Sequence, residues 1–123
     1  MRYLTDRKRA EGKGAARHGT EHHWYMQVSA VGLAFLVPTF LYIFGSALGG
    51  TRQEVLDTFS HPFAAILTAL VLVVGMRHFA KGAEMMLQDY VRGTRLKISL
   101  IAVQALSYTI IATGLFALAR IAL

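Results

Sequence analysis

Residues 60–91 read SHPFAAILTALVLVVGMRHFAKGAEMMLQDYV, and this stretch decides what kind of fold the chain can adopt. Its apolar part, 63–76, is too short to cross a bilayer, because a spanning helix needs about 20 residues. A helix that does cross must therefore continue past Arg77 and carry ionisable side chains into or near the membrane. We expect Ser60 to cap this helix and Pro62 to lie in its first turn, where proline is tolerated.

Three stretches contain no Asp, Glu, Lys or Arg, namely 22–51, 58–76 and 98–119, which are 30, 19 and 22 residues long. Hydrophobic residues make up 54% of the sequence and charged residues only 16%, against roughly 25% charged in a soluble domain. So small a chain cannot cover a soluble surface with so few polar groups. We therefore predict an all-α integral membrane protein, in which three transmembrane helices form an up-down-up bundle. The predicted spans are about 24–48, 60–91 and 96–123.

Local signals predict how the spans bend and connect. Pro38 lies near the middle of the first span and predicts a kink there. Gly45 and Gly49 form a pair of small residues four positions apart, which is typical of close helix packing in membranes. We expect a short polar loop at 50–61 and a tight turn at 93–94.

Basic residues predict the orientation of the chain, because they favour the cytoplasmic side of a span. Residues 1–23 form a polar tail without the apolar segment of a signal peptide, and 24–123 form the transmembrane anchor domain. Nine of the thirteen Lys and Arg residues lie in that tail and around the turn before the third span. The amino terminus is therefore predicted to be cytoplasmic, and the protein to be a multi-pass protein of a bacterial inner membrane. The nine residues are Arg2, Arg7, Lys8, Arg9, Lys13, Arg17, Arg92, Arg95 and Lys97.

Composition excludes several classes of function. The chain has no cysteine, so it contains no disulfide scaffold, thiolate zinc site or iron–sulfur cluster of its own. It has no phosphate-binding glycine pattern after a strand. The formal net charge is +6, but we attribute this charge to membrane topology and expect no nucleic-acid partner.

His78 is the one histidine deep in a predicted span, and it is the best candidate for a metal ligand. It shares one face of the predicted helix with Gly75 and Gly82, which lie one turn to either side. Missing side chains beside an imidazole leave a flat recess, which suits an axial ligand of haem iron. The alternative is an interior histidine that is hydrogen-bonded to another helix. The remaining histidines lie before or at the start of spans, so a second axial histidine must come from another chain. These are His18, His22, His23 and His61.

Charged side chains around this histidine allow two interpretations. Arg77 and Lys81 either extend to the cytoplasmic interface, with Lys81 paired to Glu84, or contact a haem propionate or a quinone oxygen. Asp89 and Tyr90 come at the end of the same predicted helix, at the depth of the membrane–water interface. A tyrosine there is typical of an interfacial aromatic belt, but an acid beside a phenol could also bind and protonate a polar headgroup.

His78, ten further residues and then Asp89 and Tyr90 resemble the His-x10-Asp-Tyr signature of the small membrane-anchor subunit of succinate dehydrogenase, respiratory complex II. Residues 22–30, HHWYMQVSA, resemble that family's entry into its first span. The resemblance covers most of the chain after its basic tail. One position departs from the family, because many relatives have arginine where this chain has Gln27, and the role of that arginine near the quinone is not carried over.

The resemblance implies a function within a larger complex. In that family a flavoprotein subunit oxidises succinate, an iron–sulfur subunit carries the electrons, and two anchor subunits hold haem b between them and form a ubiquinone-reduction site. The resemblance implies that His78 is an axial ligand of the haem b iron, that Tyr90 bonds a quinone carbonyl, and that Asp89 positions Tyr90 or relays protons. It also implies that this chain has no complete catalytic site of its own. Its partners would be the second anchor, the two soluble subunits and membrane lipids.

Other functions remain open from the sequence. The anchor of a fumarate reductase would resemble this chain closely, because flavin and quinone potentials set the direction of electron flow. A small transporter would normally show four spans or an acid deep within one of them. A structural anchor without a cofactor would make His78 incidental.

Overall fold

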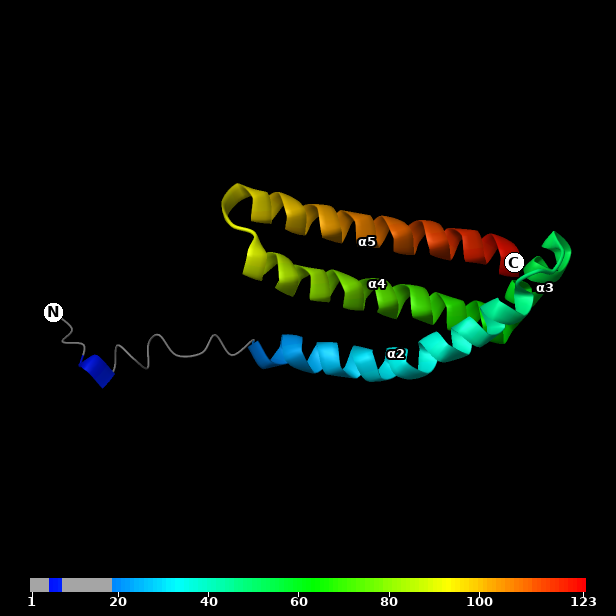
Figure 1. Ribbon diagram of the computed structural model, residues 1–123, viewed down its shortest axis with the longest axis horizontal. Coiled ribbons are helices and arrows are strands. Elements are labelled where there is room, and N and C mark those ends of the chain that lie inside the picture. Colours follow the sequence, from blue (N-terminus) through cyan, green and yellow to red (C-terminus); the bar gives the residue numbers. More distant parts are fainter. Residues whose placement is uncertain (1–4, 8–18) are drawn as a thin grey trace.

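The computed structural model describes residues 5–7 and 19–123. The tail predicted at 1–23 lies mostly outside these residues, and so do five of its six basic side chains. Within the described part, the main helices are α2 (Gly19–Ala47), α3 (Arg52–Ser60), α4 (Pro62–Tyr90) and α5 (Gly93–Ala122), as Figure 1 shows.

Three of these helices, α2, α4 and α5, are long and apolar enough to cross a membrane. They contain 29, 29 and 30 residues, and a helix of that length extends about 44 Å, against about 30 Å for the hydrocarbon core. Successive long helices run in opposite directions (Figure 1). The predicted all-α architecture with three spans running up, down and up is therefore confirmed. The helix bounds agree with the predicted spans to within a few residues.

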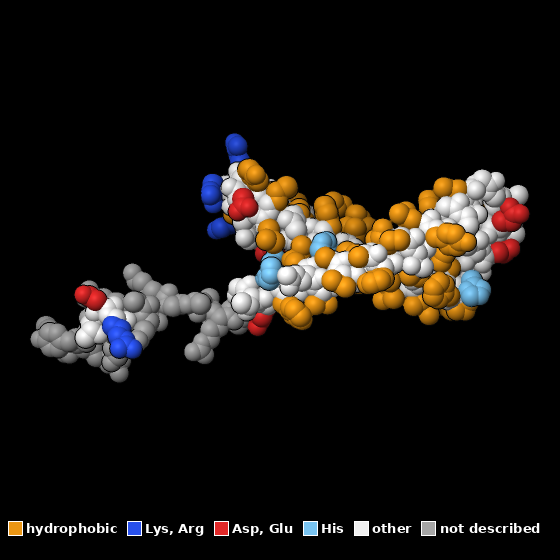
Figure 2. Space-filling view, turned by 60° about the horizontal axis from the view of Figure 1, so that its bottom comes forward, with side chains coloured by type: hydrophobic (Ala, Val, Ile, Leu, Met, Phe, Trp, Pro, Cys, Tyr) orange, Lys and Arg blue, Asp and Glu red, His pale blue; other side chains and the backbone are white. Residues whose placement is uncertain are grey.

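The three spans lie in a row with α4 in the middle (Figure 1). α4 packs along both neighbours, whereas within the described ranges no Cα atom of α2 lies within 8 Å of a Cα atom of α5. Hydrophobic side chains cover the middle of the face seen in Figure 2, and charged side chains gather towards its two ends. Such a row leaves two broad faces of α4 open to lipid or to another chain. The buried hydrophobic residues are mostly small: Ala47, Ala64, Leu67 and Ala80.

The glycine at the contact between α4 and α5 is not one of the predicted packing pair. A Cβ at Gly114 would lie 2.5 Å from Leu72 Cδ2, so any larger residue there would have to displace Leu72. A Cβ at Gly45 or Gly49 would meet nothing within 4 Å in the described part of the chain. Gly49 instead lies just beyond the end of α2, with a φ of 83° that glycine adopts without strain. Pro38 lies inside α2, and the helix bends in its second half, as the proline predicts (Figure 1).

The stretch 50–61 is not the expected loop, because most of it forms α3. Thr51 and Glu54 make a capping box, in which the Thr51 N–H donates to Glu54 Oε2 at 2.6 Å and the Glu54 N–H donates to Thr51 Oγ1 at 3.3 Å. Hydrogen bonds from the Thr51 backbone and hydroxyl hold the pKa of Glu54 below its ordinary value. The Thr-x-x-Glu spacing signals this helix, so the interpretation of the stretch as a loop from its polarity alone is wrong.

Two predicted details at the ends of α4 are also wrong. Ser60 does not cap α4; it is the last residue of α3, and His61 occupies the N-cap position of α4 without a side-chain hydrogen bond. Pro62 does lie in the first turn, as expected. The turn to α5 consists of residues 91–92, slightly earlier than predicted. Gly93 then starts α5 with a φ of 66°, in the region that glycine tolerates.

Candidate functional site

His78 lies on the part of α4 that packs against α2. Its Nδ1 is 2.7 Å from the hydroxyl oxygen of Ser29 on α2. Ser29 is only 6% exposed, so water has little access to this contact. His78 Nε2 makes no hydrogen bond with any residue that the structure describes. The ring is therefore held through one nitrogen, while the other nitrogen keeps its capacity to bind.

The alternative interpretation of His78, an interior histidine, requires a hydrogen bond to another helix. This bond is present. It does not argue against a metal ligand, because a metal-bound histidine commonly bonds a polar group through its second nitrogen. Ser29 itself was not singled out from the sequence. Ser29 lies in the stretch 22–30 that resembles the family's entry into its first span, but neither that resemblance nor hydropathy shows which way its side chain points.

The flat recess expected beside His78 is partly filled by α2. A Cβ at Gly75 would lie 3.9 Å from Leu33 Cδ2, and one at Gly82 would lie 3.7 Å from Met26 Cε. Both are ordinary van der Waals distances, so the two glycines face α2 side chains rather than an open surface. A planar group that approaches His78 must therefore come from beside the contact between α2 and α4.

Arg77 directly precedes His78 and is exposed on α4. Its guanidinium carbon is 5.9 Å from the ring centre of Tyr25 on α2, which is within the range of a cation–π interaction. Arg77 forms no ion pair within residues 19–123. An aromatic ring therefore contacts this cation, but no carboxylate of the described chain neutralises it.

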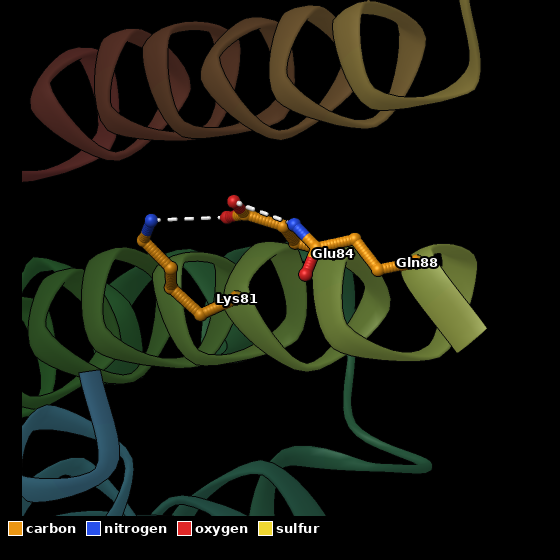
Figure 3. A network of polar contacts seen from close by, with 3 residues as sticks. All are labelled: Lys81, Glu84 and Gln88. Atoms are coloured by element: carbon orange, nitrogen blue, oxygen red, sulfur yellow. Dashed lines mark hydrogen bonds and ion pairs between the residues drawn. The ribbon is translucent and has the colours of Figure 1, made fainter. Parts of the chain in front are cut away.

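Lys81, in contrast, is neutralised within its own helix. Its Nζ is 3.0 Å from Glu84 Oε2, and Gln88 Nε2 is 3.5 Å from the other carboxylate oxygen of Glu84 (Figure 3). This is the Lys81–Glu84 pair expected if both side chains extend towards the interface. Lys81 and Glu84 line a groove between α4 and α5, together with Leu100, Ile101, Gln104 and Ala105.

Tyr90 is the last residue of α4 and is 84% exposed. It lines a pocket at the turn between α4 and α5, together with Val91, Arg92, Arg95, Ile98 and Ser99. From the sequence, Arg92 and Arg95 contributed only to the predicted orientation. The structure adds both arginines to the candidate site. Asp89 is exposed as well, but it does not line this pocket, and no hydrogen bond joins it to Tyr90 in the described part.

The candidate residues lie at two levels of α4 rather than in one cluster. Twelve positions separate His78 from Tyr90, which is about 18 Å along a helix axis. Gln27, where many relatives have arginine, lies exposed on α2 and lines a mostly apolar pocket with Trp24 and Val31. The structure therefore offers one candidate site around His78 and a separate one around Tyr90.

The donor set around His78 fits haem iron better than a bare metal ion. Among the described residues, no three His, Cys, Asp or Glu side chains gather to hold a metal ion. A porphyrin already supplies four nitrogen ligands, so each protein ligand contributes only an axial donor. The unpaired Nε2 of His78 meets that requirement.

Fold and site together define a class: small multi-span membrane proteins with a histidine held between two spans and ionisable side chains along the middle one. Comparison with known proteins narrows this class. The family described as succinate dehydrogenase/fumarate reductase transmembrane subunit matches residues 1–119. The succinate dehydrogenase hydrophobic membrane anchor subunit of Paracoccus denitrificans is 45% identical over 123 residues, which are 100% of this chain and 95% of that protein. No solved structure matches the chain significantly.

The chain belongs to the succinate dehydrogenase/fumarate reductase transmembrane subunit family. It is a membrane-anchor subunit of that oxidoreductase. The resemblance carried by His78, Asp89, Tyr90 and residues 22–30 is therefore confirmed at the level of the family.

Proposed function

We propose that this chain anchors a succinate:ubiquinone oxidoreductase, holds haem b jointly with a second anchor chain, and helps to form the site of ubiquinone reduction. The observation that carries the proposal is the state of His78, which is bonded through Nδ1 at the contact between two spans while Nε2 has no partner in the described part. The name of the P. denitrificans relative favours succinate dehydrogenase over fumarate reductase. The bacterial source of that relative favours a bacterial inner membrane as the location.

In this proposal His78 offers a neutral nitrogen to the haem iron, and a basic side chain beside it pairs with a haem propionate. Bound haem b supplies a one-electron carrier within the membrane. Arg77 is a better partner for a propionate than Lys81 is, because Lys81 already has Glu84 at 3.0 Å. Arg77 contacts the ring of Tyr25 but pairs with no carboxylate within the described residues.

The proposed quinone site lies around Tyr90 at the carboxyl end of α4, beyond His78. Tyr90 donates its O–H to a quinone carbonyl, and Arg92 and Arg95 add positive charge to the same pocket. Such donors favour an oxygen that gains negative charge as the quinone is reduced. Asp89 adjoins Tyr90 and is exposed, so it can take up protons from water and pass them towards the pocket. We propose that the iron–sulfur subunit covers this end, with the flavoprotein subunit beyond it.

A reduced-minus-oxidised optical spectrum of the purified complex tests the proposal. We expect the bands of a b-type haem, together with succinate-dependent reduction of ubiquinone. A fully assembled complex without these bands would refute the shared haem. A complex that reduces fumarate with quinol much faster than it oxidises succinate would indicate a fumarate reductase instead.

Cysteine labelling tests the predicted orientation of the chain in the membrane. The chain has no cysteine, so single cysteines can be introduced without background labelling. Arg95→Cys is expected to react with a membrane-impermeant thiol reagent only from the cytoplasmic side, because basic residues gather at that end. Asp57→Cys, in α3 at the opposite end, is the control and should react only from the periplasmic side. Labelling of Arg95→Cys in intact cells would contradict the predicted orientation and would place the proposed quinone site on the periplasmic side.

The two open faces of α4 differ in polarity, which indicates where the second anchor packs. By helical spacing, Arg77, Lys81 and Glu84 lie on one face. Phe79 and Met86, which are 52% and 55% exposed, lie on the opposite face. Charged side chains within a span face protein or water rather than lipid. We therefore place the second anchor against the charged face and lipid against the other.

Tryptophan substitutions distinguish these two faces. Leu70, which is 46% exposed, lies on the charged face by helical spacing, and Phe79, which is 52% exposed, lies on the other. Leu70→Trp is expected to lower the yield of assembled complex severalfold, because the larger ring must enter a packed contact. Phe79→Trp should leave the yield unchanged, because lipid accommodates the ring. Copurification of the two anchors measures this yield, and equal tolerance of both changes, or the reverse order, would place the second anchor elsewhere.

A further inference from the structure

We propose that Ser29 is a positioning residue for His78, which holds the imidazole hydrogen on Nδ1 and leaves the Nε2 lone pair free for iron. The identity of the metal rests on the proposed function. The position of the hydrogen rests on the contacts of Ser29 alone. The His-x10-Asp-Tyr signature assigns no role to Ser29.

The argument depends on the single hydrogen of the Ser29 hydroxyl. Its oxygen lies 2.7 Å from the carbonyl oxygen of Tyr25 and 3.1 Å from that of Met26, both in the preceding turn of α2. A carbonyl oxygen only accepts, so Ser29 donates its single hydroxyl hydrogen to these carbonyl oxygens. Towards His78, the hydroxyl therefore has only lone pairs to offer. Nδ1, at 2.7 Å, must then be the donor in that contact.

The opposite assignment leaves an unfavourable contact. If Ser29 donated to His78 Nδ1, its oxygen would face the Tyr25 carbonyl oxygen at 2.7 Å with no hydrogen between two acceptors. That distance is typical of an O–H···O hydrogen bond and too short for a neutral contact between two such oxygens. Because Ser29 is 6% exposed, water is poorly placed to relieve the contact.

A fixed hydrogen on Nδ1 has two consequences for the other ring nitrogen. First, Nε2 carries no hydrogen in the neutral ring, so it can bind a metal without first losing a proton. Second, a hydroxyl that donates to a carbonyl becomes a better acceptor, and it then draws on the Nδ1 hydrogen and makes Nε2 more electron-rich. A more basic axial nitrogen stabilises oxidised iron. Ser29 should therefore lower the midpoint potential of the haem.

Two substitutions in the assembled complex separate a hydrogen-bonding role of Ser29 from a packing role. Ser29→Ala removes the acceptor, and we expect the haem midpoint potential to rise and the electron paramagnetic g-values to change as the ring loses its anchor. Ser29→Thr keeps the hydroxyl and should retain the wild-type potential. A packing role predicts the reverse order, because threonine adds a methyl group to a buried site. Wild-type potential and g-values in Ser29→Ala would overturn the proposal.

Ser46 provides the matched control on the same helix. Its hydroxyl also bonds a carbonyl of α2, that of Ile43 at 2.7 Å, but Ser46 is exposed and this bond stays within the helix. Ser46→Ala should therefore leave the haem unchanged. If Ser29→Ala does not assemble, Ser29→Cys gives a second measurement, because sulfur is nearly the same size and a weaker acceptor. Ser29→Cys should raise the potential with normal assembly, and an unchanged potential would count against the role of Ser29.

Nitrogen magnetic resonance of histidine-labelled complex tests the hydrogen position without any activity measurement. The His78 signal is identified by its loss in His78→Gln. We expect Nδ1 to carry the hydrogen both in the haem-loaded complex and in complex prepared without haem. A hydrogen on Nε2 in the haem-free complex would refute the assignment. If the wild-type complex binds no haem, the proposed function fails in that respect, while this measurement still decides the role of Ser29.

Discussion

Replacing His78 with alanine is expected to abolish the normal spectrum of a haem with two histidine ligands and to shift its midpoint potential in the assembled complex. The substitution removes one of the two proposed axial nitrogens, and it also leaves the Ser29 hydroxyl without the partner that lies 2.7 Å away. Another group can then occupy the open position of the iron, so altered ligation is expected rather than simple loss of the haem. Optical difference spectra and a redox titration of the purified complex measure both effects.

His61→Ala is the control for the His78 substitution. His61 lies at the start of the same helix, seventeen positions before His78, which is about 25 Å along the axis. Its side chain makes no capping hydrogen bond. The spectrum and potential of this variant should equal those of the wild type. If His78→Ala also left both unchanged, His78 would not be an iron ligand.

The same geometry predicts how the chain behaves without its partner. His61 is too distant to share a haem iron with His78. His22 and His23 lie in the first turns of α2, before the predicted span 24–48, and therefore not deep in the membrane. Expressed without a second anchor, the chain should therefore yield no stable haem with two histidine ligands. The optical spectrum of the chain extracted in detergent would check this expectation, and a stable spectrum of that kind would contradict the proposal of a shared haem.

Tyr90→Phe is expected to lower the rate of ubiquinone reduction about ten- to a hundredfold, while succinate oxidation with a soluble dye continues. Phenylalanine keeps the ring at the end of α4 and deletes only the hydroxyl that we assign to the quinone. Losing one charge-assisted hydrogen bond costs roughly 1.5–3 kcal/mol, which corresponds to this range if the bond acts fully in the transition state. Parallel assays with quinone and with dye on the same preparation measure the effect.

Tyr42→Phe is the matched control for Tyr90→Phe. Tyr42 lies towards the other end of the membrane domain, in α2, and it is 79% exposed, close to the 84% of Tyr90. Loss of its hydroxyl should not affect either assay. Wild-type quinone kinetics in Tyr90→Phe would leave only the role of an interfacial aromatic residue. Loss of activity with the dye as well would indicate a defect in assembly instead.

Much of the fold could be predicted because the decisive signals are local along the chain. Three stretches without charge predict three spans, and Pro62 marks the start of the second one. The predictions failed where two local signals competed. Polarity favoured a loop at 50–61, but the capping box of Thr51 and Glu54 prevailed and formed α3. Ser60, a good helix cap by composition, lies inside α3 and leaves the N-cap of α4 to His61.

The candidate site was predictable only in part, for a related reason. Histidine, acid and phenol at a fixed spacing are visible in the sequence, so His78, Asp89 and Tyr90 could be named directly. The partners of these residues come from other helices. Ser29 reaches His78 from α2, and Arg95 joins the Tyr90 pocket from α5.

The sequence by itself therefore determined the membrane class, the number of spans and the ionisable residues on the second span. Charge is costly inside a bilayer, so each span requires an apolar segment long enough to cross it, and such segments are visible along the chain. Only the tertiary structure decided that the spans form a row, that Gly114 meets Leu72, and that His78 is bonded through Nδ1 to Ser29. These features depend on the rotation and axial shift of one helix against the next. Packing and hydrogen bonds between side chains set that register, and hydropathy does not specify it, since lipid tails are as apolar as the helix surfaces they cover.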